Sequence, residues 1–281
     1  STGLKGLRPD LVLCAIVPIL GMFAGCTPER VVSAPPEPTL GVIARVSVPA
    51  DAHRPTDSYR LPSETLTRLA NVYLRLKNNC LKAAGQPGSS SFEDDPSLFL
   101  AAAATSDVTF SALWGAFDPD GARVHGYLRS GGLSESDVGI DPALAQECGE
   151  KAAAALPGGR GWFGLASTSA WPAGGPLSPV GDSRVTAAVT AWSDCMKGRG
   201  FTTTSPVTFA LSFNELRGAS SLVSSQEIAA ATTDLACKVS TNLVGIGVAV
   251  QSAYDQAYLA EHQNDLIAWR ATIDQFLRDN A

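Results

Sequence analysis

Four widely spaced cysteines constrain the fold of this 281-residue chain more than any other sequence feature. Cys80, Cys148, Cys195 and Cys237 lie at least 42 positions apart along the chain. Zinc sites usually draw their ligands in close pairs such as Cys-x-x-Cys, so we favour two disulfides over the alternative of a metal site. Four cysteines permit three different connectivities.

The residues around each cysteine favour one of these connectivities. Cys80 and Cys195 share the pattern Cys-(Leu/Met)-x-x-x-Gly, which is typical of a cysteine in the last turn of a helix that a glycine ends. Cys148 and Cys237 fall inside the helices that we expect later in the chain. We therefore predict the disulfides Cys80–Cys148 and Cys195–Cys237, each joining the end of one helix to the body of the next long helix.

The first 25 residues have the three-part composition of a secretory signal peptide. Basic residues precede an apolar run, Leu11–Phe23, which is shorter than the roughly 20 residues that span a bilayer. The run ends in Phe23-Ala24-Gly25-Cys26, which is similar to the bacterial lipobox, where the cysteine sulfur receives diacylglycerol. We predict a lipoprotein signal peptide over 1–25 and lipidation at Cys26, with the cell membrane as a partner. The alternatives are secretion without lipid, or an apolar helix kept in the fold.

The composition changes twice after the signal peptide. Residues 26–62 hold seven prolines and little apolar periodicity, so we expect an extended Pro-rich spacer. From residue 63 to the end, 63–281, apolar residues recur at spacings of three and four, which predicts a mostly α domain. Residues 157–181 are rich in glycine and proline, and we expect an exposed loop there that joins two disulfide-linked halves, 63–156 and 182–281.

The ends of several expected helices are marked by their capping residues. Asp118-Pro119 and Asp141-Pro142 each predict a helix start, because aspartate caps the first turn and proline suits its first position. Ser224-x-x-Glu227 is a capping box. No proline follows it, and the apolar pattern from there to the end predicts one or two long C-terminal helices.

Short motifs that recur along the chain form a set: Pro49-x-Asp51-Ala52, Cys80-x4-Gly85, Gly126-Tyr127, Glu147-Cys148, Trp192-x-x-Cys195-Met196-x3-Gly200, Ala236-Cys237-Lys238, Asn242-Leu243-Val244 and Ala253-Tyr254. It resembles a family of uncharacterised exported lipoproteins of actinobacteria with paired Cys-(Met/Leu)-x3-Gly motifs at helix ends. The resemblance covers residues 49–277, with Leu81 standing where methionine is more usual. It implies a secreted, disulfide-bonded, lipid-anchored protein and no catalytic residue.

Motifs for cofactors and metals lack the context that they need. Residues 159–164 spell G-x-G-x-x-G, but a proline precedes them where a dinucleotide site requires a strand. Asp118-Pro119-Asp120-Gly121 is similar to the start of a calcium loop, yet Arg129 stands where that loop needs a glutamate. We therefore expect no cofactor, no metal and no catalytic constellation.

Trp162 and Trp171 are the candidate ligand contacts, because aromatic faces presented on a surface loop stack well on sugars or peptides. The alternative, which we favour, is that both side chains fold back over the seam between the two halves.

Charge and the missing catalytic motifs limit the function. The net charge of −6 offers no basic surface for nucleic acid. We expect an extracytoplasmic lipoprotein, more a binding or structural module of the cell envelope than an enzyme, whose partner is an envelope protein or glycan. One alternative is an envelope hydrolase whose site is not visible in the sequence, which a deep cleft around His125 would favour. Another is a chaperone-like protein with an exposed apolar stripe around Val244–Val250.

Overall fold

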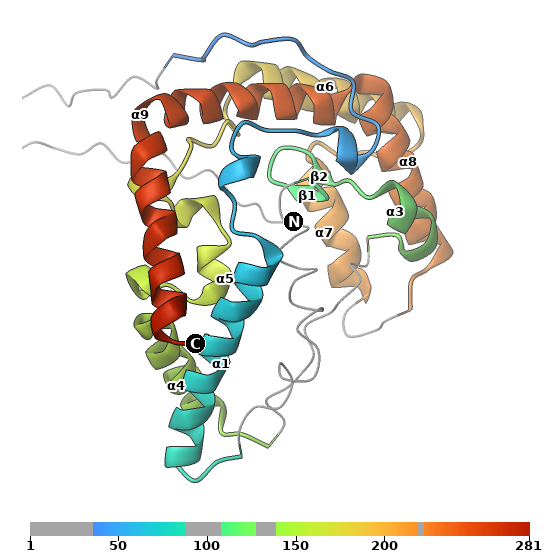
Figure 1. Cartoon of the computed structure of the whole chain (residues 1–281). Helices are drawn as coiled ribbons and strands as arrows, with labels where there is room; N and C mark the ends of the chain where they lie inside the picture. The colour runs from blue at the N-terminus through green and yellow to red at the C-terminus, as the bar shows by residue number, and fades with distance from the viewer. Residues whose placement is uncertain (1–35, 88–107, 128–138, 218–221) are drawn as a thin grey trace, which may run out of the picture. The chain divides into compact units, whose positions relative to one another are not determined.

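A computed structural model describes residues 36–87, 108–127, 139–217 and 222–281. The chain divides into two units, Ser1–Pro36 and Glu37–Ala281, and all described helices belong to the second. This unit is mostly α-helical and ends in one very long helix, α9 (Leu243–Asp279), as the sequence predicts (Figure 1). Within the described ranges, no helix combines the length and apolarity needed to cross a bilayer.

The first pair of helices is α1 (Ser63–Ala83) and α4 (Pro142–Ala155). Leu66, Leu69 and Leu81 bury one face of α1, and Asp141 caps α4 by accepting hydrogen bonds from the amides of Ala143 and Leu144. The disulfide Cys80–Cys148 joins the two helices, with 5.5 Å between their Cα atoms, as predicted.

A second helical group surrounds α6 (Ser183–Gly198), which packs against α8 (Ser225–Thr241) and α9. The predicted disulfide Cys195–Cys237 joins α6 to α8. Asn242 separates α8 from α9 in the left-handed conformation, with φ of 55°, so that the chain turns without a longer loop. The core of this group includes the fully buried Trp192 and Val250.

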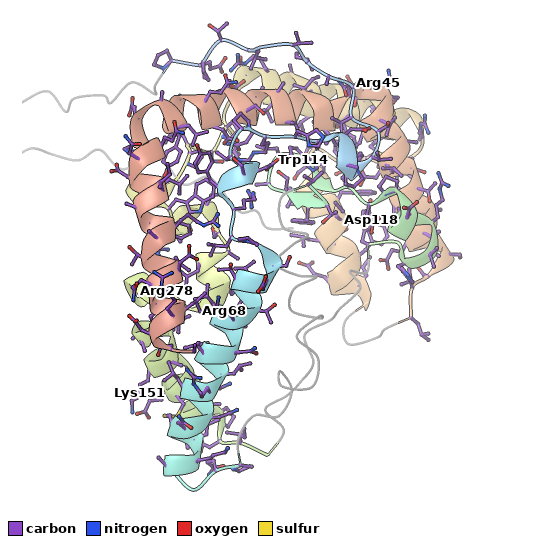
Figure 2. All side chains as sticks on the ribbon, viewed as in Figure 1. Arg45, Arg68, Trp114, Asp118, Lys151 and Arg278 are labelled. Atoms are coloured by element: carbon purple, nitrogen blue, oxygen red, sulfur yellow. A yellow bond between two sulfur atoms is a disulfide. The ribbon has the colours of Figure 1, made fainter. Side chains whose placement is uncertain are left out.

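Short elements fill the space beside these helices. A hairpin of β1 (Phe110–Ser111) and β2 (Gly115–Ala116) places Trp114 beneath α9 (Figure 2). A Cβ atom at Gly247 of α9 would lie 2.7 Å from the indole ring of Trp114, so this close packing requires glycine. Outside residues 157–181, the other short elements are α3 (Pro119–His125), α7 (Pro206–Arg217), η1 (Pro49–Asp51) and η2 (Asp57–Tyr59).

The described part of the predicted spacer is packed against the helices rather than extended into solvent. Residues 37–61, which we name the strap, run along α9, turn at η1 and return to the start of α1 (Figure 1). Val46 is 1% exposed, and the carboxylate of Asp255 on α9 binds the Arg54 guanidinium at 2.8 Å and the Thr56 hydroxyl. Side chains far along the chain supply these contacts, so local periodicity does not reveal them.

The predicted exposed loop 157–181 is also folded. It contains η3 (Pro157–Gly159), α5 (Trp162–Leu165), η4 (Thr168–Ala170) and η5 (Pro172–Gly174). Trp162 packs in one core with α1 and with the end of α9, so α9 joins the two expected halves. Because glycine and proline break long helices but not short turns, this segment folds around its aromatic residues.

Candidate functional site

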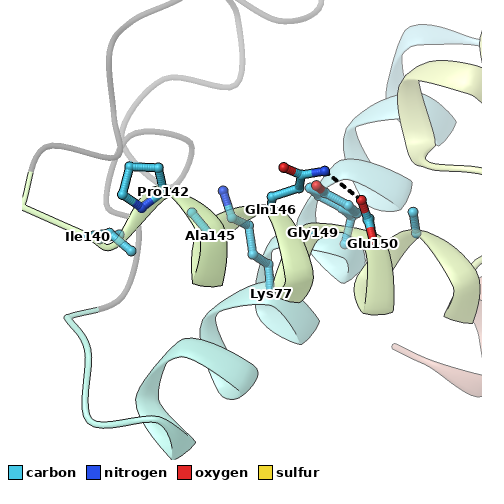
Figure 3. Close-up of a pocket in the computed structure, with 9 residues that line it drawn as sticks. Lys77, Ile140, Pro142, Ala145, Gln146, Gly149 and Glu150 are labelled. Atoms are coloured by element: carbon cyan, nitrogen blue, oxygen red, sulfur yellow. Dashed lines mark hydrogen bonds between the residues drawn. The ribbon is translucent and has the colours of Figure 1, made fainter.

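A hollow with mixed chemistry lies between α1 and α4, and we name it the α1–α4 groove (Figure 3). Its volume is about 570 Å³, and it is open to solvent. Apolar residues form one end, and polar side chains form the other. The lining residues are Tyr73, Lys77, Ile140, Pro142, Ala145, Gln146, Gly149, Glu150 and Ala153.

Helical spacing explains how these residues come together. On α4, Gly149 and Glu150 lie three and four positions after Gln146, and Ala153 lies four and three positions after them, so these residues share one face of the helix. Tyr73 and Lys77 are likewise one turn apart on α1. The disulfide Cys80–Cys148 lies within a turn of Lys77 and Gln146 and fixes the distance between the two helices.

The polar end of the groove holds groups of both charges. Gln146 Nε2 donates a hydrogen bond to Glu150 Oε1 at 2.9 Å, and both side chains are exposed (Figure 3). Lys77 is largely buried in the wall of the groove. A Cβ atom at Gly149 would lie 3.0 Å from the Tyr73 hydroxyl oxygen, so glycine leaves that hydroxyl room. The groove therefore offers an apolar surface beside an amide, a carboxylate, an amine and a phenol hydroxyl.

A second group of polar residues, the Asp234 cluster, is sealed inside the protein. The Asp234 carboxylate on α8 accepts hydrogen bonds from Lys238 Nζ at 2.6 Å, Trp192 Nε1 at 2.9 Å and Tyr127 Oη at 3.0 Å. Lys238 Nζ also donates to the Ala116 carbonyl of β2 at 2.6 Å. Asp234 and Lys238 are 1% and 0% exposed, so this cluster ties elements together and is closed to a ligand.

Burial sets the electrostatics of the Asp234 cluster. Loss of water raises the pKa of the Asp234 carboxyl and lowers that of the Lys238 amine, and the attraction between the two groups opposes both changes. Burial also raises the pKa of the Tyr127 hydroxyl, and the Asp234 carboxylate raises it further. The hydroxyl therefore stays protonated and donates to Asp234.

The strap begins at a third polar group, which we name the Glu37 clamp. The Glu37 carboxylate accepts hydrogen bonds from the amide of Ser183 at 2.6 Å and from its hydroxyl at 2.7 Å. Arg184 donates to the Pro38 carbonyl at 2.6 Å and binds the Asp182 carboxylate at 2.6 Å. The amino end of α6, where the helix dipole favours anions, thus holds the start of the strap.

The Glu37 clamp gives the stability of the protein a pH dependence. Hydrogen bonds from Arg184 lower the pKa of the Asp182 carboxyl below its ordinary value of about 3.9. The folded protein therefore binds fewer protons than the unfolded chain, and this contribution is complete above about pH 4 and lost as the pH falls through the lowered pKa. We expect Asp182→Asn to reduce the loss of unfolding free energy between pH 4 and pH 2, measured by urea denaturation. Equal pH slopes for the variant and the native protein would contradict this assignment.

The structure separates the residues that the sequence singles out. Trp162 and Trp171 are 3% and 4% exposed, so neither presents a face to a ligand. This agrees with the favoured interpretation, in which both side chains fold back onto the protein. Trp171 instead stacks on Tyr258 of α9, with 6.2 Å between ring centroids. His125 is exposed at the end of α3, outside the α1–α4 groove. Cys26 lies outside the described residues.

Of two other expectations from the sequence, the structure contradicts one and confirms the other. Val244 and Val250 are both fully buried. The expectation of an exposed apolar stripe, as a chaperone-like protein would need, is therefore wrong. Asp118 accepts a hydrogen bond from the Gly121 amide at 2.9 Å, as its interpretation as a helix cap requires. Across the described ranges, no three His, Cys, Asp or Glu side chains gather closely enough to hold a metal ion.

Sequence reasoning missed the α1–α4 groove, although one signal for it was present. The predicted pairing of Cys80 with Cys148 brings the turn before each cysteine together, and these turns carry Lys77 and Gln146.

Comparison with known proteins adds no relative to this picture. No family model, no curated protein and no solved structure matches the chain.

Proposed function

We propose that this protein is a membrane-anchored extracytoplasmic lipoprotein that serves as a binding module of the cell envelope. Two disulfides between helices support an oxidising compartment outside the cytoplasm, because cytosolic thiols are kept reduced. The lipobox-like Phe23-Ala24-Gly25-Cys26 supports anchoring through acyl chains on Cys26.

The α1–α4 groove is the observation that carries the binding role. It is open to solvent, and its two walls are cross-linked, so little conformational entropy is lost when a ligand enters. An apolar end beside hydrogen-bonding groups suits a ligand with both kinds of surface. We propose a peptide segment or a glycan of the cell envelope as that ligand.

A charge reversal at Glu150 tests this function. Envelope peptides and glycans are passed over the immobilised protein, and the retained material is identified and quantified by mass spectrometry. We expect Glu150→Lys to reduce retention of the principal ligand about tenfold, which corresponds to about 1.4 kcal/mol of binding free energy. Glu150 lines the groove and is exposed, so the substitution leaves the core untouched.

Glu147 provides the matched control for Glu150. It lies one turn earlier on α4, is also exposed and does not line the groove. Glu147→Lys is expected to retain ligand as the native protein does. Equal retention by both variants, or no retained ligand at all, would exclude the groove as the binding site.

A further inference from the structure

We infer that the surface of residues 174–181, at the amino end of α6, lies against the lipid bilayer when Cys26 is acylated. This inference rests on the proposed lipid anchor and adds an orientation to it. We name this surface the 174–181 face, and its occupant is the bilayer itself.

The first support is the length of the tether. The Glu37 clamp fixes where the chain leaves the folded unit, because Glu37 and Pro38 are bound to Ser183 and Arg184. Glu37 follows Cys26 by 11 positions. Such a segment spans at most about 40 Å when fully extended and about 20 Å as a flexible coil. A lipidated Cys26 therefore keeps the Glu37 clamp, and whatever lies beside it, close to the membrane surface.

The second support is the position of the 174–181 face beside that exit point. Val180 lies three positions before Ser183, the residue that binds Glu37. The Asp182 amide donates to the Pro179 carbonyl at 2.9 Å, and Gln251 of α9 donates to the Leu177 carbonyl at 3.5 Å. The face is thus held to both α6 and α9 next to the start of the tether.

The third support is the chemistry of the face. Residues 161–181 contain no charged side chain, although charged residues flank them on both sides. Leu177 and Val180 are 59% and 54% exposed, while the tryptophans of the same segment are buried. Charged groups oppose the approach of a protein to the apolar part of a bilayer, and exposed aliphatic side chains favour it. An uncharged surface with two protruding aliphatic residues is therefore suited to the bilayer interface.

Hydrogen exchange on the reconstituted full-length protein tests this orientation. The acylated chain is inserted into vesicles of phosphatidylethanolamine and phosphatidylglycerol, and amide exchange is followed by mass spectrometry. The reference is Cys26→Ser protein mixed with the same vesicles. We expect exchange at residues 174–181 to slow at least fivefold in the acylated sample, and exchange in α7 to stay the same.

Two surface variants link the protection to the aliphatic residues. In the double variant Leu177→Ser with Val180→Ser, the protection at residues 174–181 is expected to disappear while acylation persists. Leu216→Ser is the matched control, because Leu216 is 81% exposed and belongs to α7, whose main neighbours are β2 and α8. This control is expected to keep the protection in full.

The possible outcomes separate the inference from the function on which it rests. A Cys26 peptide that carries no acyl chain by mass spectrometry overturns both the anchor and the orientation. An acylated Cys26 with unchanged exchange at residues 174–181 overturns the orientation alone. Protection that appears only after envelope proteins are added to the vesicles assigns the face to a protein partner and also overturns it.

Discussion

Replacing Lys238 with alanine is expected to lower the unfolding free energy by about 3–5 kcal/mol, because it leaves the Asp234 carboxylate buried without a countercharge. Asp234 would retain hydrogen bonds from Tyr127 and Trp192, but the cation that offsets its loss of water would be gone. The Ala116 carbonyl would lose its donor as well. Urea denaturation at pH 7 with intact disulfides measures the change.

The chain contains a matched control for this substitution. Glu147 and Lys151 on α4 form an ion pair with the same spacing of four residues, but their side chains are 57% and 64% exposed. We expect Lys151→Ala to cost less than about 0.5 kcal/mol, since solvent screens the charge that remains. Similar losses for Lys151→Ala and Lys238→Ala would show that burial is not the cause.

A second variant separates the loss of charge balance from the loss of packing. Asp234→Asn combined with Lys238→Met removes both charges and keeps side chains of similar length. Because replacing a buried ion pair by neutral groups costs much less than breaking it, the double variant is expected to be more stable than Lys238→Ala. A double variant less stable than the single one would contradict this account of the Asp234 cluster.

Removing the disulfide Cys195–Cys237 is expected to lower the unfolding free energy by about 4 kcal/mol. The estimate follows from the chain entropy that the unfolded protein regains when a loop of this size opens. The two cysteines lie 42 positions apart, and each sits in a helix of the same core. Cys195→Ala with Cys237→Ala, compared with the native protein by urea denaturation, gives the value.

The other disulfide is the internal comparison. Cys80 and Cys148 are separated by 68 positions, so the same model gives a slightly larger cost for the pair Cys80→Ala with Cys148→Ala. An unfolding free energy that remains unchanged on removal of either disulfide would show that these bonds do not stabilise the fold.

Local signals predicted much of this structure. Gly85 and Gly200 lie at positive φ just after α1 and α6, where the sequence predicts the helices to end. Ser224 caps α8 as predicted, since its hydroxyl accepts from the Glu227 amide at 3.1 Å, while the Glu227 carboxylate accepts from the amide of Tyr127. Both disulfides follow from the same reasoning, because it placed each cysteine on its helix.

The errors occur where contacts between distant residues determine burial. The glycines and prolines of residues 157–181 indicate an exposed loop, yet this segment is folded, and Tyr258 and Trp269 of α9 cover its Trp171. The strap likewise shows no periodicity, because its partners lie far along the chain: Asn242, between α8 and α9, and Asp255 of α9. The α1–α4 groove also depends on the pairing of two helices that are distant along the chain. The predicted disulfide Cys80–Cys148 was therefore its only signal in the sequence.

The strap has a consequence for the order in which the protein matures. Val46 binds Asn242 across 196 positions, and Arg54 binds Asp255 across 201. A chain that emerges amino end first, from a ribosome or through a secretion channel, presents these residues long before their partners arrive. Native docking of the amino-terminal segment therefore waits until the final helix has emerged.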